Sequence, residues 1–274
     1  MEKNTAWAIG LSSVVLIGFF FLQTFMMPKQ QASEQSTQEK TVVSATDETE
    51  NSVEPDKILS AEKVVSSTKD NLTEETYTVE TETVKVLFTN RGGDIIGYSL
   101  KNHIDSDTKM PIEMSSNVSE NNRAFAVAFG DADSPINNEI FVAKKINDTT
   151  IGFLKKYSMN NSDGTKGEFT LVKTYTFDPT DYVFKLDVTV VPGENFKGLD
   201  VNSSAYSIRT SPQMGPYYNP KINRYENRQF ITYNGKNKKR IILGTNQTKS
   251  YDKEWNWVSM AGKYFKVLTL PAKS

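Results

Sequence analysis

The sequence predicts a mainly β domain, an antiparallel sandwich, behind one N-terminal transmembrane helix and a disordered stalk. Three observations support this fold class. An uncharged apolar run lies near the N-terminus, an acidic polar segment without aromatic residues follows it, and apolar residues alternate with period two over the remainder. These changes in composition and pattern divide the 274 residues into an anchor at 1–28, a stalk at 29–76 and a β domain at 77–274.

The first element is a run of 21 uncharged residues from Trp7 to Met27. As a helix it would reach roughly 32 Å, which matches a hydrocarbon core of about 30 Å. Leu11, Leu16 and Phe20 are among the apolar residues that favour insertion. A cleaved signal peptide is the alternative, but its apolar region is shorter and ends at small residues. We therefore expect an uncleaved anchor, with the N-terminus inside the cell and the body outside.

The second element, residues 29–76, is rich in Ser, Thr, Glu, Gln and Asp and contains no aromatic residue. Such a composition buries too little apolar area to offset the entropy that ordering costs. A flexible chain of this length has a root-mean-square span of roughly 40 Å. We expect a flexible spacer, and a partner-binding tail is the alternative.

The third element begins at Tyr77 and shows hairpin patterns. Apolar residues alternate at 84–88, and a turn follows that contains two consecutive glycines. The clearest hairpin joins alternating residues at 169–177 to a second run at 182–190 through an Asp-Pro-Thr-Asp turn. Further runs lie at 95–100, 125–129, 140–146, 151–157, 201–208, 229–233 and 240–243. No long amphipathic helix interrupts them, so we expect antiparallel sheets packed as a sandwich.

The last segment fits two patterns. Trp257, Met260 and Tyr264 lie at helical spacing, whereas the residues that follow alternate. We expect a short helical turn near Trp255 and then a strand that ends at Pro271.

The residue inventory argues against catalysis. There is no cysteine, so a thiolate nucleophile is excluded, and with His103 as the only histidine a zinc site lacks further soft ligands. His103 follows a predicted strand and precedes Asp105, so we interpret it as a surface turn residue rather than as the base of a catalytic triad. The formal net charge of -1 gives no sign of a nucleic-acid partner. Carboxylates are numerous, but nothing singles out a catalytic pair. We expect no enzyme activity, no metal and no cofactor.

Two polar motifs have plain structural interpretations. Arg91-Gly92-Gly93 lacks the spacing of a phosphate loop and precedes a strand, so a tight turn explains it. A basic cluster follows Asn234-Gly235 and comprises Lys236, Lys238, Lys239 and Arg240. A solvated hairpin loop is the default for this cluster, and contact with lipid headgroups or an acidic partner is the alternative.

Taken together, these stretches resemble the N-terminal half of a bacterial YidC-type membrane protein insertase. The resemblance rests on the order and spacing of several short segments over essentially the whole chain. They are the anchor and stalk, residues 84–94 with Arg91, Gly92 and Gly93, then 99–101, 171–177, 182–184, the loop 209–216 with Gly215 and Pro216, and finally 257–260, 264–265 and 270–271.

This resemblance implies a periplasmic β-super-sandwich, similar in fold to galactose-mutarotase-like domains. It implies an insertase and chaperone that aids the insertion, folding and assembly of integral membrane proteins, with or without the Sec translocase. The partners would be nascent membrane proteins, Sec components and the lipid bilayer. The chain would lie in the bacterial inner membrane with its β domain in the periplasm. The family's later transmembrane helices are missing here, so we expect a fragment whose domain continues past Ser274.

Two other interpretations stay open at the level of the sequence. The chain could be an envelope protein that binds or modifies carbohydrate, for which aromatic and carboxylate residues would converge on a concave face. It could also be a tethered structural domain.

Overall fold

The computed structural model covers most of the β domain. It describes residues 72–201, 204–210, 216, 228–244 and 247–272 with their side chains, and residues 64–66 and 213–214 as backbone alone. The strands are β1 (Val64–Ser66), β2 (Thr76–Glu80), β3 (Val84–Thr89), β4 (Asp94–Ile104), β5 (Pro111–Glu113), β6 (Ser115–Ser116), β7 (Ala126–Phe129), β8 (Val142–Asn147), β9 (Thr150–Asn160), β10 (Lys166–Phe177), β11 (Phe184–Pro192), β12 (Tyr206–Arg209), β13 (Gln213–Met214), β14 (Gln229–Tyr233), β15 (Lys238–Ile241), β16 (Trp257–Ala261) and β17 (Lys266–Thr269).

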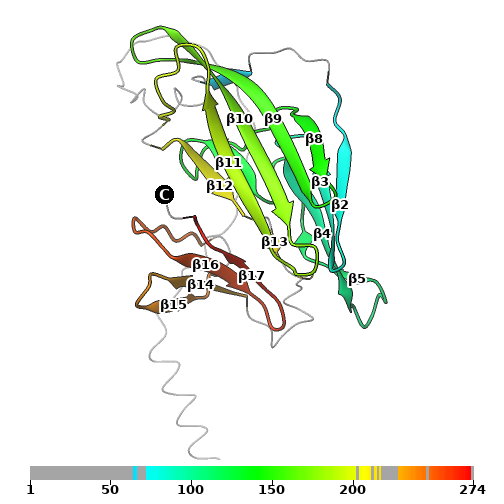
Figure 1. Ribbon diagram of the computed structural model, residues 1–274. Helices are drawn as coiled ribbons and strands as arrows, with labels where there is room; N and C mark the ends of the chain where they lie inside the picture. Colours follow the sequence, from blue (N-terminus) through cyan, green and yellow to red (C-terminus); the bar gives the residue numbers. More distant parts are fainter. Residues whose placement is uncertain are drawn as a thin grey trace, which may run out of the picture. The chain divides into compact units, whose positions relative to one another are not determined.

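All strand pairs in the described part of the chain are antiparallel, and the strands form three larger sheets (Figure 1). The first has the order β1-β9-β10-β11, with β8 also paired to β9. The second has the order β2-β3-β4-β5, and the third has the order β15-β14-β16-β17. Two short ladders, β12-β7 and β13-β6, complete the pairing. The prediction of a mainly β, antiparallel domain is therefore confirmed.

The main core lies between the first and second sheets. Phe88 of β3 packs against Phe153 of β9 and Tyr175 of β10, with ring centroids 5.7 and 4.9 Å apart. All three side chains are buried. Alternation explains this arrangement, because every second residue of a strand points to the same face. The contact between Phe88 and Tyr175 is edge-to-face, a geometry that adds about 0.5–1.5 kcal/mol beyond the burial of apolar area.

The predicted central hairpin is confirmed. Phe177 of β10 pairs with Phe184 of β11, and the register continues without a break to Phe169 and Pro192. Asp178 closes the turn, because its carboxylate accepts hydrogen bonds from the backbone amides of Thr180 and Asp181. This is the Asx geometry for which Asp is favoured at turns.

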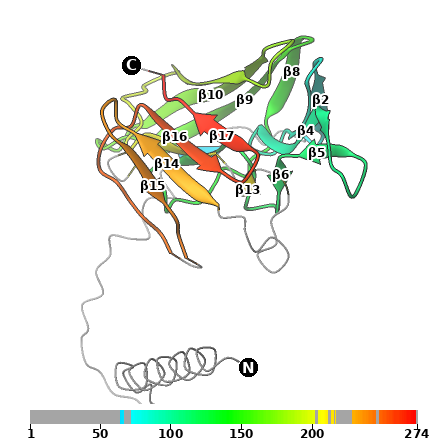
Figure 2. The ribbon, with the colours of Figure 1, turned by 90° about the horizontal axis from the view of Figure 1, so that it is seen from below.

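The third sheet joins the core along one side (Figure 2). Met260 of β16 and Val267 of β17 pack against the buried cluster of the first two sheets. The predicted helical turn near Trp255 is wrong, since this segment enters β16 without a helix. Val258 pairs with Thr232 of β14, and these cross-strand hydrogen bonds prevail over the helical spacing of the side chains.

The predicted anchor at 1–28 lies outside the described residues, together with most of the stalk. In the part of the chain that the structure describes, no helix has the length and apolar character needed to cross a bilayer. Two pieces of the expected stalk are described, and both contact the body. Residues 64–66 form β1 and pair with β9, and residues 72–75 lead directly into β2.

Candidate functional site

The Arg91-Gly92-Gly93 turn connects β3 to β4 and fits only glycine at its centre. Gly92 and Gly93 have φ angles of +71° and +62°, a region that L-residues with side chains rarely adopt. A Cβ on Gly93 would lie 2.7 Å from the Cβ of Phe153, which is too close for two carbon atoms. The two glycines therefore let the backbone turn directly above the aromatic core.

A buried ionic cluster lies beneath this turn and comprises Asp94, Lys173 and Arg123. All three side chains are at most 3% exposed. The Lys173 ammonium donates to the Asp94 carboxylate, and to the carbonyls of Gly92 and Phe125 at 3.0 Å each. The Nε of Arg123 donates to the other Asp94 oxygen at 2.9 Å. The Lys173 ammonium and the Arg123 guanidinium therefore both donate to the Asp94 carboxylate, and buried charges need such partners to be stable.

The electrostatics of this cluster follow from its burial. Burial lowers the pKa of Lys173 from its ordinary value, and the adjacent Asp94 carboxylate acts in the opposite direction. Burial also raises the pKa of the Tyr175 phenol well above its ordinary value. That phenol donates to the carbonyl of Gly93 at 3.0 Å. Since these groups are enclosed and bonded to one another, the cluster holds the turn on β10 and presents nothing to an outside substrate.

The end of the predicted stalk is held by the same turn. Arg91 donates from Nε and a terminal nitrogen to one Glu74 oxygen, at 3.0 and 2.9 Å. Thr89 donates to the other Glu74 oxygen at 2.9 Å. These hydrogen bonds keep the pKa of Glu74 below its ordinary value. Asn90 adds two bonds, to the carbonyl of Thr73 and from the amide of Glu75. We call residues 73–75 and 89–91 the stalk clamp.

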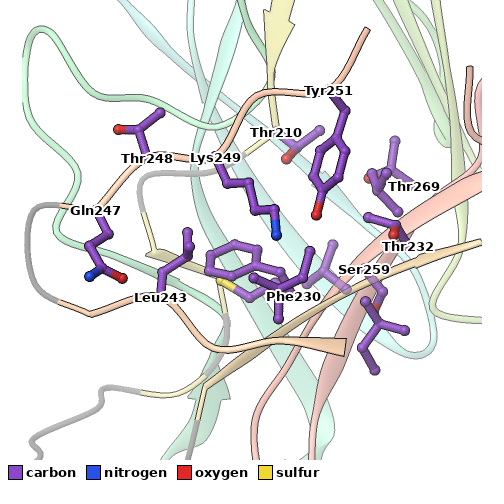
Figure 3. Close-up of a pocket in the computed structure, with 15 residues that line it drawn as sticks. Thr210, Phe230, Thr232, Leu243, Gln247, Thr248, Lys249, Tyr251, Ser259 and Thr269 are labelled. Atoms are coloured by element: carbon purple, nitrogen blue, oxygen red, sulfur yellow. The ribbon is translucent and has the colours of Figure 1, made fainter. Parts of the chain in front are cut away.

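A cavity of about 410 Å³ lies on one face of the third sheet (Figure 3). This face carries Phe230, Thr232, Met260 and Val267, which are paired across the strands or alternate along one strand and therefore point to the same side. Met260 and Val267 pack on the core, so we call it the inner face. Leu243 and residues 247–251, which we call the covering segment, lie across the cavity from the sheet.

The cavity combines an apolar floor with a few polar groups. Tyr251 and Lys249 project from the covering segment toward Phe230 (Figure 3), with the Lys249 ammonium 5.5 Å from the Tyr251 ring centroid. The hydroxyls of Tyr251 and Thr232 are buried without a hydrogen-bond partner. Pockets of this kind suit an apolar chain that carries a few hydrogen-bonding groups. No carboxylate lines this cavity.

The profile of one protein family, the YidC periplasmic domain, matches residues 76–274. The chain belongs to the YidC periplasmic domain family. The match begins at β2 and includes the glycine turn, the buried cluster and the third sheet, so every structural feature described above except β1 and the start of the stalk clamp lies within the YidC domain.

Two curated relatives are both named Membrane protein insertase YidC. The protein from Treponema denticola is 34% identical over 283 residues, which cover 99% of this chain and 48% of the relative. The protein from Treponema pallidum is 30% identical over 320 residues, which cover 99% of this chain and 51% of the relative. The chain spans about half the length of these curated relatives. The name of these relatives describes the insertion of proteins and mentions no catalysed reaction.

Several residues singled out in the sequence have clear places in the YidC domain. Arg91, Gly92 and Gly93 form the turn above the buried cluster. The carbonyl of Pro216 accepts a hydrogen bond from Arg228. His103 lies exposed near the end of β4, with its ring 5.4 Å from Tyr182 and 5.7 Å from Phe265. Outside the described residues lie Gly215 and the anchor residues Trp7, Leu11, Leu16, Phe20 and Met27.

The basic cluster lies on the hairpin that sequence analysis predicted. Asn234 closes the turn between β14 and β15 by accepting from the amides of Lys236 and Asn237, and Gly235 has a φ of +88°. Lys238, Lys239 and Arg240 follow in β15 and are exposed. Within the described residues, no group of three or more His, Cys, Asp or Glu side chains could hold a metal ion.

Two features of the site were missed by sequence reasoning. Lys173 occupies a position at which the alternation of β10 predicts a buried residue. A lysine at such a position indicates a buried cation, which needs a buried carboxylate as its partner, and this was the signal in the sequence. The cavity left no such signal, because it arises where a loop without a motif folds over the third sheet.

Proposed function

We propose that this chain is the membrane anchor, stalk and periplasmic domain of a membrane protein insertase. The insertase would aid the insertion, folding and assembly of integral membrane proteins, with or without the Sec translocase. One observation carries the proposal: two proteins named Membrane protein insertase YidC align with 99% of this chain, and the family profile spans 76–274.

In this proposal residues 1–28 cross the bacterial inner membrane, residues 29–76 form the stalk, and the β domain from 77 onward lies in the periplasm as a super-sandwich. The partners are nascent membrane proteins, Sec translocase components and the lipid bilayer. Moving a client into lipid would depend on membrane-spanning helices that the resemblance places after the β domain. The β domain would then act as a rigid docking body, for which a fully bonded buried cluster is suited.

The test is an insertion assay in cells whose endogenous protein can be depleted. A newly synthesised inner-membrane reporter should lose its protease-protected fraction on depletion and regain it when the native gene is restored. A soluble periplasmic reporter serves as control and should be exported at an unchanged rate in a Sec-proficient strain. An unchanged protected fraction after full depletion would refute the insertase proposal.

The carbohydrate interpretation has less support. A sugar site combines an aromatic platform with carboxylates or amides that bind hydroxyls. The cavity on the inner face has the aromatic residues Phe230 and Tyr251 and the amide of Gln247, but no carboxylate lines it and most of its floor is apolar. A glycan array probed with the chain should therefore show no specific binding.

A further inference from the structure

The third sheet has a second face, whose residues follow from the strand register. Ile231 and Ser259 at the centre of this face also line the cavity, and Ser259 is only 6% exposed, so the exposed part of the face is formed by the residues around them. Directly paired residues of antiparallel strands point to the same side. Arg240 pairs with Ile231, Ile231 with Ser259, and Ser259 with Leu268, so these four residues form one row across the sheet. The row on one side contains Lys238, Tyr233 and Trp257. The row on the other side contains Gln229, Ala261 and Lys266. We call these ten residues the outer face.

The outer face is basic. Lys238, Arg240 and Lys266 are exposed on it, and no ion pair involves them within the described residues. The four strands β14–β17 contain no Asp or Glu at all. Over residues 228–272 there are nine Lys or Arg residues and only two acids, although the whole chain has a net charge of -1. Positive charge is therefore concentrated in this part of the chain, and three of the nine cations lie on the outer face.

The outer face is also apolar between its cations. Leu268 is 47% exposed, and Leu270, just past the end of β17, is 64% exposed. Ile242, just past the end of β15, is 63% exposed. Trp257 and Tyr233 stack on one another with ring centroids 5.5 Å apart and an interplanar angle of 27°. These residues give the sheet aliphatic and aromatic groups beside each cationic row.

We propose that the outer face docks on the surface of an anionic phospholipid bilayer. Lys and Arg bind anionic headgroups, Trp and Tyr favour the interface, and exposed Leu and Ile reach the upper acyl region. A protein partner would need acidic groups facing the cations, whereas a bilayer supplies a negative surface to all three rows at once. The proposal rests on the membrane tether of the proposed function, which would hold the sheet close to a bilayer.

The size of the effect follows from the charges. Each Lys or Arg near an anionic surface strengthens binding by roughly fivefold, so three of them give a factor of about 100. The attraction is screened by salt, because the Debye length falls to about 3 Å at 1 M. Docking should therefore be reversible, strongly salt-dependent and specific for anionic lipid.

The test uses the full chain in lipid nanodiscs. Because the chain has no cysteine, Leu270→Cys provides a single site for an environment-sensitive NBD fluorophore. With phosphatidylglycerol in the nanodiscs we expect blue-shifted emission and quenching by spin-labelled lipid. Both should be absent in pure phosphatidylcholine and should be lost at high salt.

The deciding variant is Lys238→Gln with Arg240→Gln and Lys266→Gln, which should lower the ratio of docked to undocked domain by about 100-fold. A matched control removes three exposed lysines from other parts of the domain, Lys109, Lys144 and Lys166, and should leave docking unchanged. Equal loss in both triple variants would mean that only net charge matters and would overturn the assignment to this face.

Two further outcomes would also overturn the proposal. Blue-shifted NBD emission in detergent, without anionic lipid, would mean that protein covers the outer face. Emission typical of water in every lipid would mean that the face stays in solvent. Neither outcome affects the insertion assay, so failure of lipid docking is distinguishable from failure of the proposed function.

Discussion

At the residue scale, the turn between β3 and β4 shows how one conformation constrains several side chains. Gly93 has to be glycine because its φ is +62° and Phe153 fills the space beside it. The close approach that results brings the carbonyl of Gly92 within reach of Lys173, and that of Gly93 within reach of Tyr175. Backbone geometry and the buried cluster therefore depend on each other.

Gly93→Ala should destabilise the domain by more than backbone strain alone, which is about 1–3 kcal/mol, because the new Cβ meets Phe153. Gly164→Ala is the matched control, since Gly164 also has a positive φ of +80° but nothing within 4 Å of the added carbon. Urea unfolding of the full chain in detergent measures both. Equal losses of unfolding free energy would contradict the close packing at Gly93.

Asp94→Asn should lower the free energy of unfolding by about 3–5 kcal/mol, because it leaves Lys173 and Arg123 as two buried cations without a carboxylate. The control is Glu80→Gln, which breaks a solvent-exposed pair with Lys101 and should cost much less, because exposed ion pairs contribute little to stability. Thermal or urea unfolding distinguishes them. A loss as small as that of the control would mean that the cluster contributes little.

At the element scale, the domain gains order from segments that look unstructured in sequence. Residues 64–66 add a strand to the edge of β9, and the stalk clamp fixes residues 73–75 against the glycine turn. The backbone groups of these segments find partners on the sheets, and that is what makes them ordered. The stalk therefore enters the domain at a defined place.

The clamp predicts a small acid-dependent loss of stability. Arg91 and Thr89 hold the pKa of Glu74 below its ordinary value of 4.5 in the folded state. A depressed carboxyl pKa adds stability that is fully present above the unfolded pKa and is lost as pH falls through the folded pKa. Glu74 is 47% exposed, so the contribution should be under about 1 kcal/mol.

Glu74→Gln should remove this contribution at neutral pH and flatten the part of the stability curve below about pH 4.5. Unfolding free energies of both proteins measured from neutral to acid pH would check it. If the difference between them does not change with pH, the clamp carries no ionic component.

At the scale of the whole molecule, the proposed arrangement of anchor, stalk and β domain makes a topological prediction. A cysteine at the exposed residue Ser106 should react with a membrane-impermeant maleimide in intact spheroplasts, because the β domain would lie outside the inner membrane. Thr5→Cys, placed before the predicted anchor, should react only after lysis. Labelling of Thr5→Cys in intact spheroplasts, or protection of Ser106→Cys, would reverse the proposed orientation.

The sequence by itself determined the mainly β, antiparallel character of the domain, the central hairpin and the glycine turn. These depend on local signals, namely period-two alternation and residues that tolerate positive φ, which act within a few residues of each other. It also supplied the resemblance to the YidC family. The helical spacing near Trp255 misled the prediction, because pairing with β14 is a contact between distant segments that no local pattern encodes.

Only the tertiary structure decided which residues meet. Asp94 of β4 and Lys173 of β10 are far apart along the chain and come together because their sheets pack face to face. Arg123 joins them because its neighbour Ala124 forms an antiparallel bridge with Ile95 of β4. The cavity and the basic outer face likewise exist only once β14–β17 pair in one register, since a shift by one residue would exchange the two faces. Charge and hydropathy are properties of the sequence, but the surface on which they gather is set by strand pairing.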